Sequence, residues 1–214
     1  MSNKKSNTYT FTFALIVCVV CSFTLALVSE GLRSRKELNV EMDIKKNILK
    51  VVNMSTPLPE KADATTIKRI YQENIKELVI DTNGNIVEGN LPSDIQEGEE
   101  LLPLFIYEES GRPISYTFPI ICKGLWSTLY GYFALEPDGV TVRGITFYQH
   151  GETPGLGAEI EKDWFTNNFK GKKIWDLDKN DLAPVVVIKG KVADKIAQGD
   201  QQHYVDGIRC ATIT

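Results

Sequence analysis

A long uncharged stretch near the N-terminus constrains this chain more than any other feature. Residues 6–29 contain no charge, and residues 11–28 are apolar except for three hydroxyl residues. As a helix, the eighteen residues of this run rise about 27 Å, close to the hydrocarbon thickness of a bilayer. The sequence therefore predicts a single transmembrane anchor within residues 1–30, with lipid contact through residues 9–29, followed by one domain over residues 31–214.

Two alternatives concern this segment. A cleavable signal peptide would have a shorter apolar core and a small-residue cleavage site, and no convincing Ala-x-Ala site follows here. Positive charges lie on both sides of the run, so they do not decide which end is cytoplasmic.

Cys18 and Cys21 share one face of the helix, either as a metal or redox pair or as small packing residues. We favour packing, because a lone CxxC is weak evidence.

Composition excludes several classes of protein. Apolar residues are 43% and charged residues 24%, which is typical of a globular chain. A net charge of −4 argues against binding nucleic acid through a basic surface. The only two histidines, His150 and His203, cannot form a multi-histidine metal centre. Cys122 and Cys210 are either joined in one disulfide or present as two isolated buried thiols.

Hydrophobic periodicity predicts helices first and strands afterwards. Val40–Met54 is an expected amphipathic helix, Thr65 or Thr66 is expected to cap a second one, and Ala158–Phe169 is expected to form a third. Short strands are expected at Leu78–Asp81, Ile86–Glu88, Leu104–Tyr107, Ile114–Ile121, Ser127–Leu135, Val140–Gln149 and Pro184–Ile188. This order indicates an α+β fold, in which an antiparallel or mixed sheet with flanking helices follows the transmembrane helix.

Chemistry-bearing motifs are few. The sequence has no dinucleotide fingerprint, no Walker A sequence and no Gly-x-Ser-x-Gly elbow. The segment His150–Gly157 has three glycines and one proline in eight residues, so it predicts an irregular loop where a planar ligand can approach the main chain. An ordinary connecting loop is the alternative. From pattern alone, Asp206–Thr214 reads as a frayed terminus.

Four strings carry a resemblance to a known family. Gly124–Thr128, Glu136–Gly139, Gly144–Tyr148 and His150–Gly157 follow an N-terminal anchor, and this arrangement resembles the C subunit of the sodium-translocating NADH:quinone oxidoreductase. The resemblance spans essentially the whole chain. It implies an electron-carrying subunit of a membrane-bound oxidoreductase and sodium translocase, not active alone, with FMN as its cofactor.

The resemblance also implies partners and a location. The partners would be the other members of a complex of six subunits, a flavin transferase that attaches the FMN, and the lipid bilayer. The protein would be a single-pass protein of the bacterial inner membrane with its soluble domain on the periplasmic side.

The family attaches FMN to a threonine through a phosphoester, within the motif Asp-x-x-Ser/Thr-Gly-Ala-Thr. Asp206, Ala211 and Thr212 match this motif, with Thr212 on the acceptor. Arg209 departs from it where the family has Ser or Thr, and Cys210 where the family has Gly. The resemblance also implies that further residues in or near the matched strings surround the flavin: Trp126, Glu152, Thr153, Leu156, Gly157 and Lys189.

Alternatives remain for some of these residues and for the function. Each of three residues has an alternative to a place beside the flavin. Trp126 can equally be a core residue, Glu152 a cap of the following helix, and Lys189 a solvated surface lysine. The runner-up function is the G subunit of the ferredoxin:NAD-oxidoreductase complex. A structural subunit without flavin, because of the altered motif, and a membrane-anchored module for free flavin complete the set.

Overall fold

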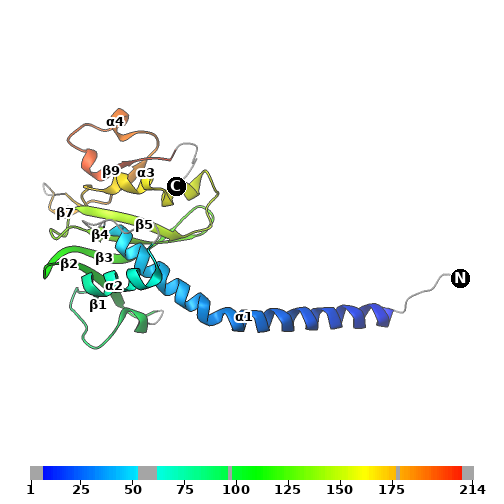
Figure 1. The fold of residues 1–214 in the computed structure, drawn as a ribbon. Helices are drawn as coiled ribbons and strands as arrows, with labels where there is room; N and C mark the ends of the chain where they lie inside the picture. Colours follow the sequence, from blue (N-terminus) through cyan, green and yellow to red (C-terminus); the bar gives the residue numbers. More distant parts are fainter. Residues whose placement is uncertain (1–6, 53–61, 96–97, 177–178, 209–214) are drawn as a thin grey trace. The chain divides into compact units, whose positions relative to one another are not determined.

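The computed structural model describes residues 7–52, 62–95, 98–176 and 179–208. The chain divides into two compact units, residues 1–43 and 44–214 (Figure 1). The elements in chain order are α1 (Asn7–Val51), α2 (Ala64–Asn74), β1 (Ile75–Asp81), η1 (Pro92–Asp94), β2 (Leu101–Glu109), β3 (Arg112–Lys123), β4 (Thr128–Leu135), β5 (Val142–Gln149), η2 (Gly157–Glu161), α3 (Asp163–Thr166), η3 (Asn167–Phe169), β6 (Trp175–Asp176), β7 (Asp181–Leu182), β8 (Val186–Ile188), α4 (Val192–Lys195), η4 (Gln201–His203) and β9 (Tyr204–Asp206).

The N-terminal unit is helical. Residues 8–51 form a helix long and apolar enough to cross a membrane, judged by length and composition. The side chains of the apolar run are exposed, including those of Cys18 and Cys21. The amphipathic segment expected from Val40 is the last part of this same helix rather than a separate one. No proline interrupts α1, and Arg33 pairs with Glu37 one turn further on, at 3.0 Å. Pro57 and Pro59, which disfavour a continuing helix, lie outside the described residues.

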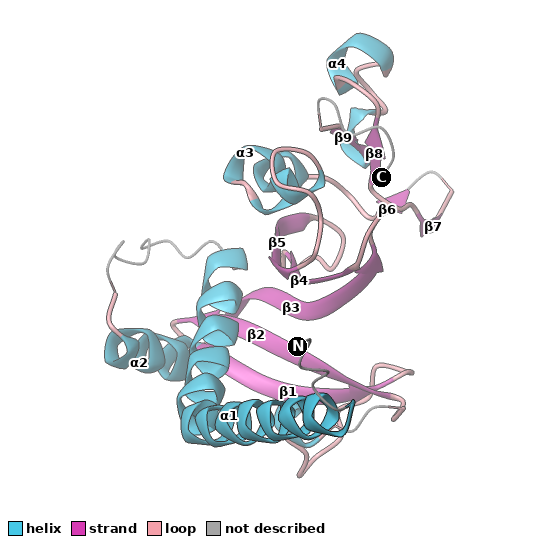
Figure 2. Ribbon diagram, turned by 90° about the vertical axis from the view of Figure 1, so that its right-hand side faces the viewer, coloured by secondary structure: helices cyan, strands magenta, loops and turns pink. Residues whose placement is uncertain are grey.

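The larger unit is built on a five-stranded antiparallel sheet. Strands β1 to β5 pair in sequence order, so every connection within the sheet joins neighbouring strands (Figure 2). Two further pairs are small: β6 with β7 is antiparallel, and β8 with β9 is parallel. The expected antiparallel or mixed sheet with flanking helices is confirmed, as is the α+β class.

Strand β4 packs against apolar side chains on both of its faces. Successive side chains on a strand point to opposite faces. Phe133 and Leu135 belong to the face that packs on Phe165 and Phe169, which follow η2. Tyr132 and Ala134 belong to the other face, where Phe105 of β2 meets Tyr132 edge-on at 6.0 Å. The end of α1 reaches this face at Gly144, the partner of Ala134, where a Cβ would lie 3.5 Å from Cγ2 of Val51. Four side chains at this end of the helix and just beyond it are buried: Ile48, Leu49, Val51 and Val52.

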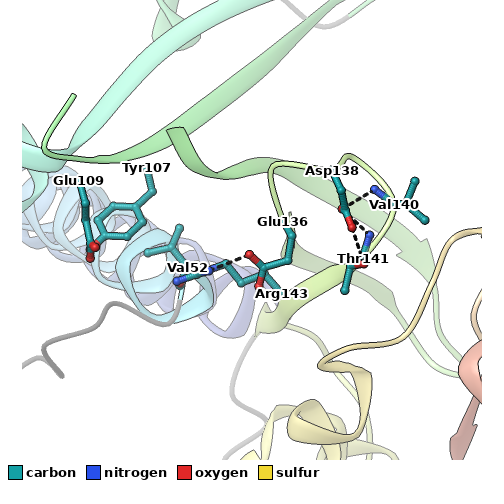
Figure 3. Close-up of polar contacts among 8 residues, drawn as sticks. All are labelled: Val52, Tyr107, Glu109, Glu136, Asp138, Val140, Thr141 and Arg143. Atoms are coloured by element: carbon teal, nitrogen blue, oxygen red, sulfur yellow. Dashed lines mark hydrogen bonds and ion pairs between the residues drawn. The ribbon is translucent and has the colours of Figure 1, made fainter. Parts of the chain in front are cut away.

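Polar bonds join the C-terminal end of α1 to the β4–β5 hairpin. Arg143 donates from Nε to the carbonyl of Val52 and from a terminal nitrogen to Glu136 Oε2, at 2.9 Å (Figure 3). Gly144 follows, and a Cβ there would lie 2.5 Å from the carbonyl oxygen of Val51. Helix and strand therefore approach as closely as a glycine allows. Nearby, Tyr107 donates to Glu109, and burial raises the pKa of Tyr107 to about 12.

The hairpin turn is held by one carboxylate. Asp138 Oδ1 accepts from the backbone N–H groups of Val140, at 2.9 Å, and Thr141, at 2.8 Å (Figure 3). Asp138 Oδ2 accepts from the hydroxyl of Thr141 at 2.6 Å. The Thr141 side chain, followed by these backbone donors, lowers the pKa of the Asp138 carboxyl below its ordinary value.

Three local expectations were wrong. Asp63, not Thr65 or Thr66, caps α2, because its carboxylate accepts from the N–H of Thr66 at 3.3 Å. The helix expected over Ala158–Phe169 is three short turns, η2, α3 and η3. It breaks at Lys162, whose extended backbone starts α3 at Asp163, and the Asp163 carboxylate pairs with Lys50 at 2.9 Å.

The third wrong expectation is the strand at Ile86–Glu88. This stretch forms only an isolated bridge to Ile80 in place of a strand.

Gly144→Ala should destabilise the larger unit by about 1–3 kcal/mol, because the added methyl pushes the end of α1 off β5. Urea unfolding of the detergent-solubilised chain measures the change. Gly199→Ala is the matched control, because a Cβ at Gly199 meets nothing within 4 Å. Equal free energies of unfolding for the two variants would contradict this packing.

Acid should weaken the hairpin turn. Because the pKa of Asp138 is lowered in the folded state, its stabilisation is present above the unfolded pKa of about 4 and is lost as pH falls through the folded value. Asp138→Asn should therefore flatten the loss of stability below pH ~4, since an amide has no charge to lose. The measurement is the midpoint temperature of thermal unfolding from pH 3 to 6. If this midpoint falls below pH ~4 as steeply in the variant as in the wild type, Asp138 does not stabilise the turn as described.

Candidate functional site

The turn between β3 and β4 presents two apolar side chains to solvent. Gly124 donates its N–H to the carbonyl of Ser127 at 2.8 Å, which closes the turn. Leu125 and Trp126 at its tip are 56% and 72% exposed. Residues 121–128 line a shallow hollow of about 480 Å³ here. We call residues 124–127 the Trp126 turn.

The glycine-rich loop follows β5 and precedes η2, as expected. The carbonyl of Thr153 accepts from the N–H groups of Leu156 and Ala158, both at 3.1 Å. Gly155 has a φ of +74°, a conformation that other residues rarely adopt. His150 at its start accepts on Nδ1 from the N–H of Glu152 at 3.3 Å. The loop therefore has the fixed path that its composition predicts.

Glu152 joins the glycine-rich loop to the Trp126 turn. Its Oε1 accepts from the backbone N–H of Trp126 at 3.0 Å and from that of Ser127 at 3.2 Å. A third bond runs in the opposite direction, from the N–H of Gly151 to Ser127 Oγ at 2.5 Å. Glu152 does not cap the following helix, because η2 begins at Gly157 without a side-chain capping bond.

A larger pocket of about 570 Å³ lies where the glycine-rich loop, α3 and β9 contribute residues. Gly155 lines it, together with Trp164, which is 49% exposed. Asp206 and Gly207 line it from β9 and just after it. The remaining lining residues are Glu159, Asn168, Gly190, Lys191 and Ile208. Ligand pockets commonly have this size and combine one or two aromatic faces with a few polar groups.

The pocket wall at β9 is tightly constructed. Asp206 Oδ1 accepts from the N–H of Val192 at 2.7 Å, which ties β9 to the start of α4. Gly207 donates its N–H to the carbonyl of Gly190 at 2.9 Å. A Cβ on Gly207 would overlap the carbonyl oxygen of Ile188, so only glycine lets β8 and the chain after β9 approach this closely.

The structure brings together only some of the expected site residues. Trp126, Glu152 and Gly157 gather at the Trp126 turn, since a Cβ on Gly157 would lie 2.9 Å from Glu152 Cβ. Thr153 and Leu156 are exposed on the same loop. Asp206 lies at the larger pocket, whereas Lys189 is exposed and its neighbours Gly190 and Lys191 line that pocket instead.

Other expected residues lie elsewhere or outside the description. Ala211 and Thr212 lie outside the described residues, as do Arg209 and Cys210. Trp126 is not a core residue. Cys122 is exposed with a free thiol, so both alternatives given for it, a disulfide with Cys210 and a buried thiol, were wrong.

Comparison with known proteins shows which family the chain belongs to. The FMN-binding domain family matches residues 124–214, which include the Trp126 turn, the glycine-rich loop and β9. The C subunit of the Na(+)-translocating NADH-quinone reductase of Pseudomonas aeruginosa is 31% identical, over 100% of this chain and 89% of that protein. The chain belongs to the family of C subunits of the Na(+)-translocating NADH-quinone reductase. The C subunit of Vibrio alginolyticus is 28% identical, over 100% of this chain and 88% of that protein.

Solved structures of such C subunits agree with this membership. The crystal structure from Parabacteroides distasonis superimposes with a TM-score of 0.68 at 35% identity, covering 83% of this chain and 84% of that one. The crystal structure of Shewanella oneidensis NqrC gives a TM-score of 0.64 at 26% identity, covering 80% of this chain and 85% of that one. The family and the fold expected from the sequence are therefore confirmed, and these relatives are named as C subunits rather than as G subunits.

Two candidate residues escaped the sequence reasoning. Trp164 donates from Nε1 to Glu159 Oε2 at 3.1 Å, which orients its ring at the larger pocket. Its spacing from Ile160 resembles an ordinary helix face, so no signal distinguished it. Ser127 accepts the loop bond from Gly151, and only its place in the matched string Gly124–Thr128 could have indicated a role.

Gly207→Ala should separate β8 from β9 and open the pocket wall, because the new methyl collides with the carbonyl of Ile188. We expect a loss of about 1–3 kcal/mol in the free energy of unfolding. Chemical denaturation monitored by tryptophan fluorescence checks this value. A variant as stable as Gly199→Ala would show that β8 and β9 do not approach as described.

Proposed function

We propose that this chain carries FMN covalently on Thr212 and relays electrons as the C subunit of a Na(+)-translocating NADH-quinone reductase. The observation that supports this most is the pocket beside Asp206 and Ile208, within the segment matched by the FMN-binding family. Thr212 follows Ile208 by four residues, which span at most about 14 Å when extended. A cofactor attached at Thr212 is therefore within reach of this pocket.

The residues at the pocket fit a flavin. A volume of about 570 Å³ accommodates part of a ligand of this size, and the half-exposed face of Trp164 suits a planar ring. Asn168 and Glu159 offer hydrogen-bonding groups to a ribityl chain, and Lys191 offers a cation to a phosphate. The open backbone of the glycine-rich loop lets a ring approach at Gly155.

The protein would bind and orient the cofactor, and the flavin would supply the redox chemistry. The Trp126 turn and the glycine-rich loop offer exposed apolar side chains, Trp126 and Leu156, beside which a ring can lie. A covalent tether prevents dissociation, which suits a relay that passes electrons without consuming a substrate. Lys189 is proposed near the flavin on its place in the chain alone.

The altered motif has definable consequences. Arg209 replaces a small hydroxyl residue with a cation that can pair with the flavin phosphate. Cys210 adds a side chain where the family has glycine, which narrows the approach of a flavin transferase. Because of these two positions, the second candidate function is that of a structural subunit without flavin.

The proposed setting follows from the family and the anchor. Residues 1–30 would hold the protein in the bacterial inner membrane by a single span, and residues 31–214 would lie on the periplasmic side. The other members of the complex of six subunits and a flavin transferase would be its partners. The acidic net charge of −4 agrees with the absence of nucleic acid from this set.

Intact mass of the denatured chain tests the attachment. The full chain is co-expressed with a flavin transferase, purified and denatured, and we expect a mass gain of one FMN less one water. Thr212→Val should abolish the gain, because the phosphoester needs the threonine hydroxyl, whereas Thr214→Val should leave it unchanged.

An unmodified wild-type mass would contradict the proposal. Repeating the measurement with Arg209→Ser and Cys210→Gly together then separates two causes. A restored gain identifies the altered motif as the obstacle, and continued absence supports the structural subunit.

A further inference from the structure

Glu152 belongs to the proposed flavin site, yet its carboxylate is engaged with the protein itself. Oε1 accepts two backbone N–H groups, those of Trp126 and Ser127, from a turn 25 and 26 residues earlier in the chain. A carboxylate holding two amide donors makes charge-assisted bonds, which are about twice as strong as neutral ones. The exposed turn therefore depends on a residue from the neighbouring loop.

Glycines on both sides make room for this side chain. A Cβ on Gly124 would overlap Glu152 Oε1, and a Cβ on Gly157 would lie 2.9 Å from both Cβ and Oε2 of Glu152. Gly151 is similarly tight, since a Cβ there would lie 3.1 Å from the Cβ of Ser127. Glu152 is thus flanked by Gly124 and Gly157, which belong to two strings that are separated in the sequence.

We infer that Glu152 is a positioning residue that fixes the backbone of the Trp126 turn against the glycine-rich loop before any flavin is bound, rather than a residue that contacts the flavin. A turn that is ordered in advance loses less conformational entropy when a ligand binds. The flavin part of this inference rests on the proposed function, whereas the ordering of the turn does not.

Amide hydrogen exchange of the full chain in detergent, without flavin, tests the ordering directly. In Glu152→Ala, the N–H groups of Trp126 and Ser127 should exchange about tenfold faster or more, because both lose their acceptor. The amides of Phe133 and Ile145 in the sheet should be unchanged. Glu152→Gln keeps an oxygen in place and should restore most of the protection.

Glu161→Ala is the matched control. Glu161 is a carboxylate of the same size at the end of η2, and its partners are the side chains of His150 and Lys162. Protection of Trp126 and Ser127 should not change in this variant. Unaltered exchange of these two amides in Glu152→Ala, or equal acceleration in Glu161→Ala, would overturn the inference.

A second arm uses the chain loaded with flavin. If Glu152 positions Trp126, then Glu152→Ala and Trp126→Phe should change the flavin fluorescence yield in the same direction, and the double variant should add little to either. Fully additive effects would show that Glu152 acts on the flavin separately. Intact mass of each variant shows whether flavin is attached, so a failure of flavinylation is distinguished from a failure of the inference.

Discussion

The double-sided burial of β4 is the constraint on which the rest of the domain depends. Its alternate side chains enter two apolar layers, one with Phe165 and Phe169 and the other with Phe105 and the end of α1. A strand buried on both faces must lie inside the sheet, between β3 and β5. This places the β3–β4 turn and the end of β5 beside one another, so the Trp126 turn and the glycine-rich loop are neighbours.

The site itself is held by polar bonds to the backbone. Glu152 and Ser127 each accept N–H groups from the partner loop, and Asp206 accepts one from Val192. Each of these acceptors satisfies main-chain donors that a loop cannot pair within itself. The apolar side chains of Trp126, Leu156 and Trp164 remain exposed around this framework. Rigid backbone with exposed aromatic surface is the arrangement that a planar cofactor needs.

Much of the fold could be predicted because its signals are local. The uncharged run, the alternation of β3 to β5 and the turn at Glu136–Gly139 each follow from a few neighbouring residues, and all three are present. The helix expected over Ala158–Phe169 failed because tertiary contact decides it. Phe165 and Phe169 satisfy a helical period, but Lys162 adopts an extended backbone and Asp163 pairs with Lys50, far away in sequence. The role of Glu152 was equally hidden, because its partners lie 25 residues away.

The central claim is that a flavin attached at Thr212 rests at the pocket formed by the glycine-rich loop, α3 and β9. A crystal structure of the flavin-loaded chain tests this most directly. The account predicts electron density continuous with the Thr212 side chain and a flavin whose ring or ribityl chain contacts Trp164 and the backbone at Gly155. Density for a flavin that does not touch this pocket would contradict it.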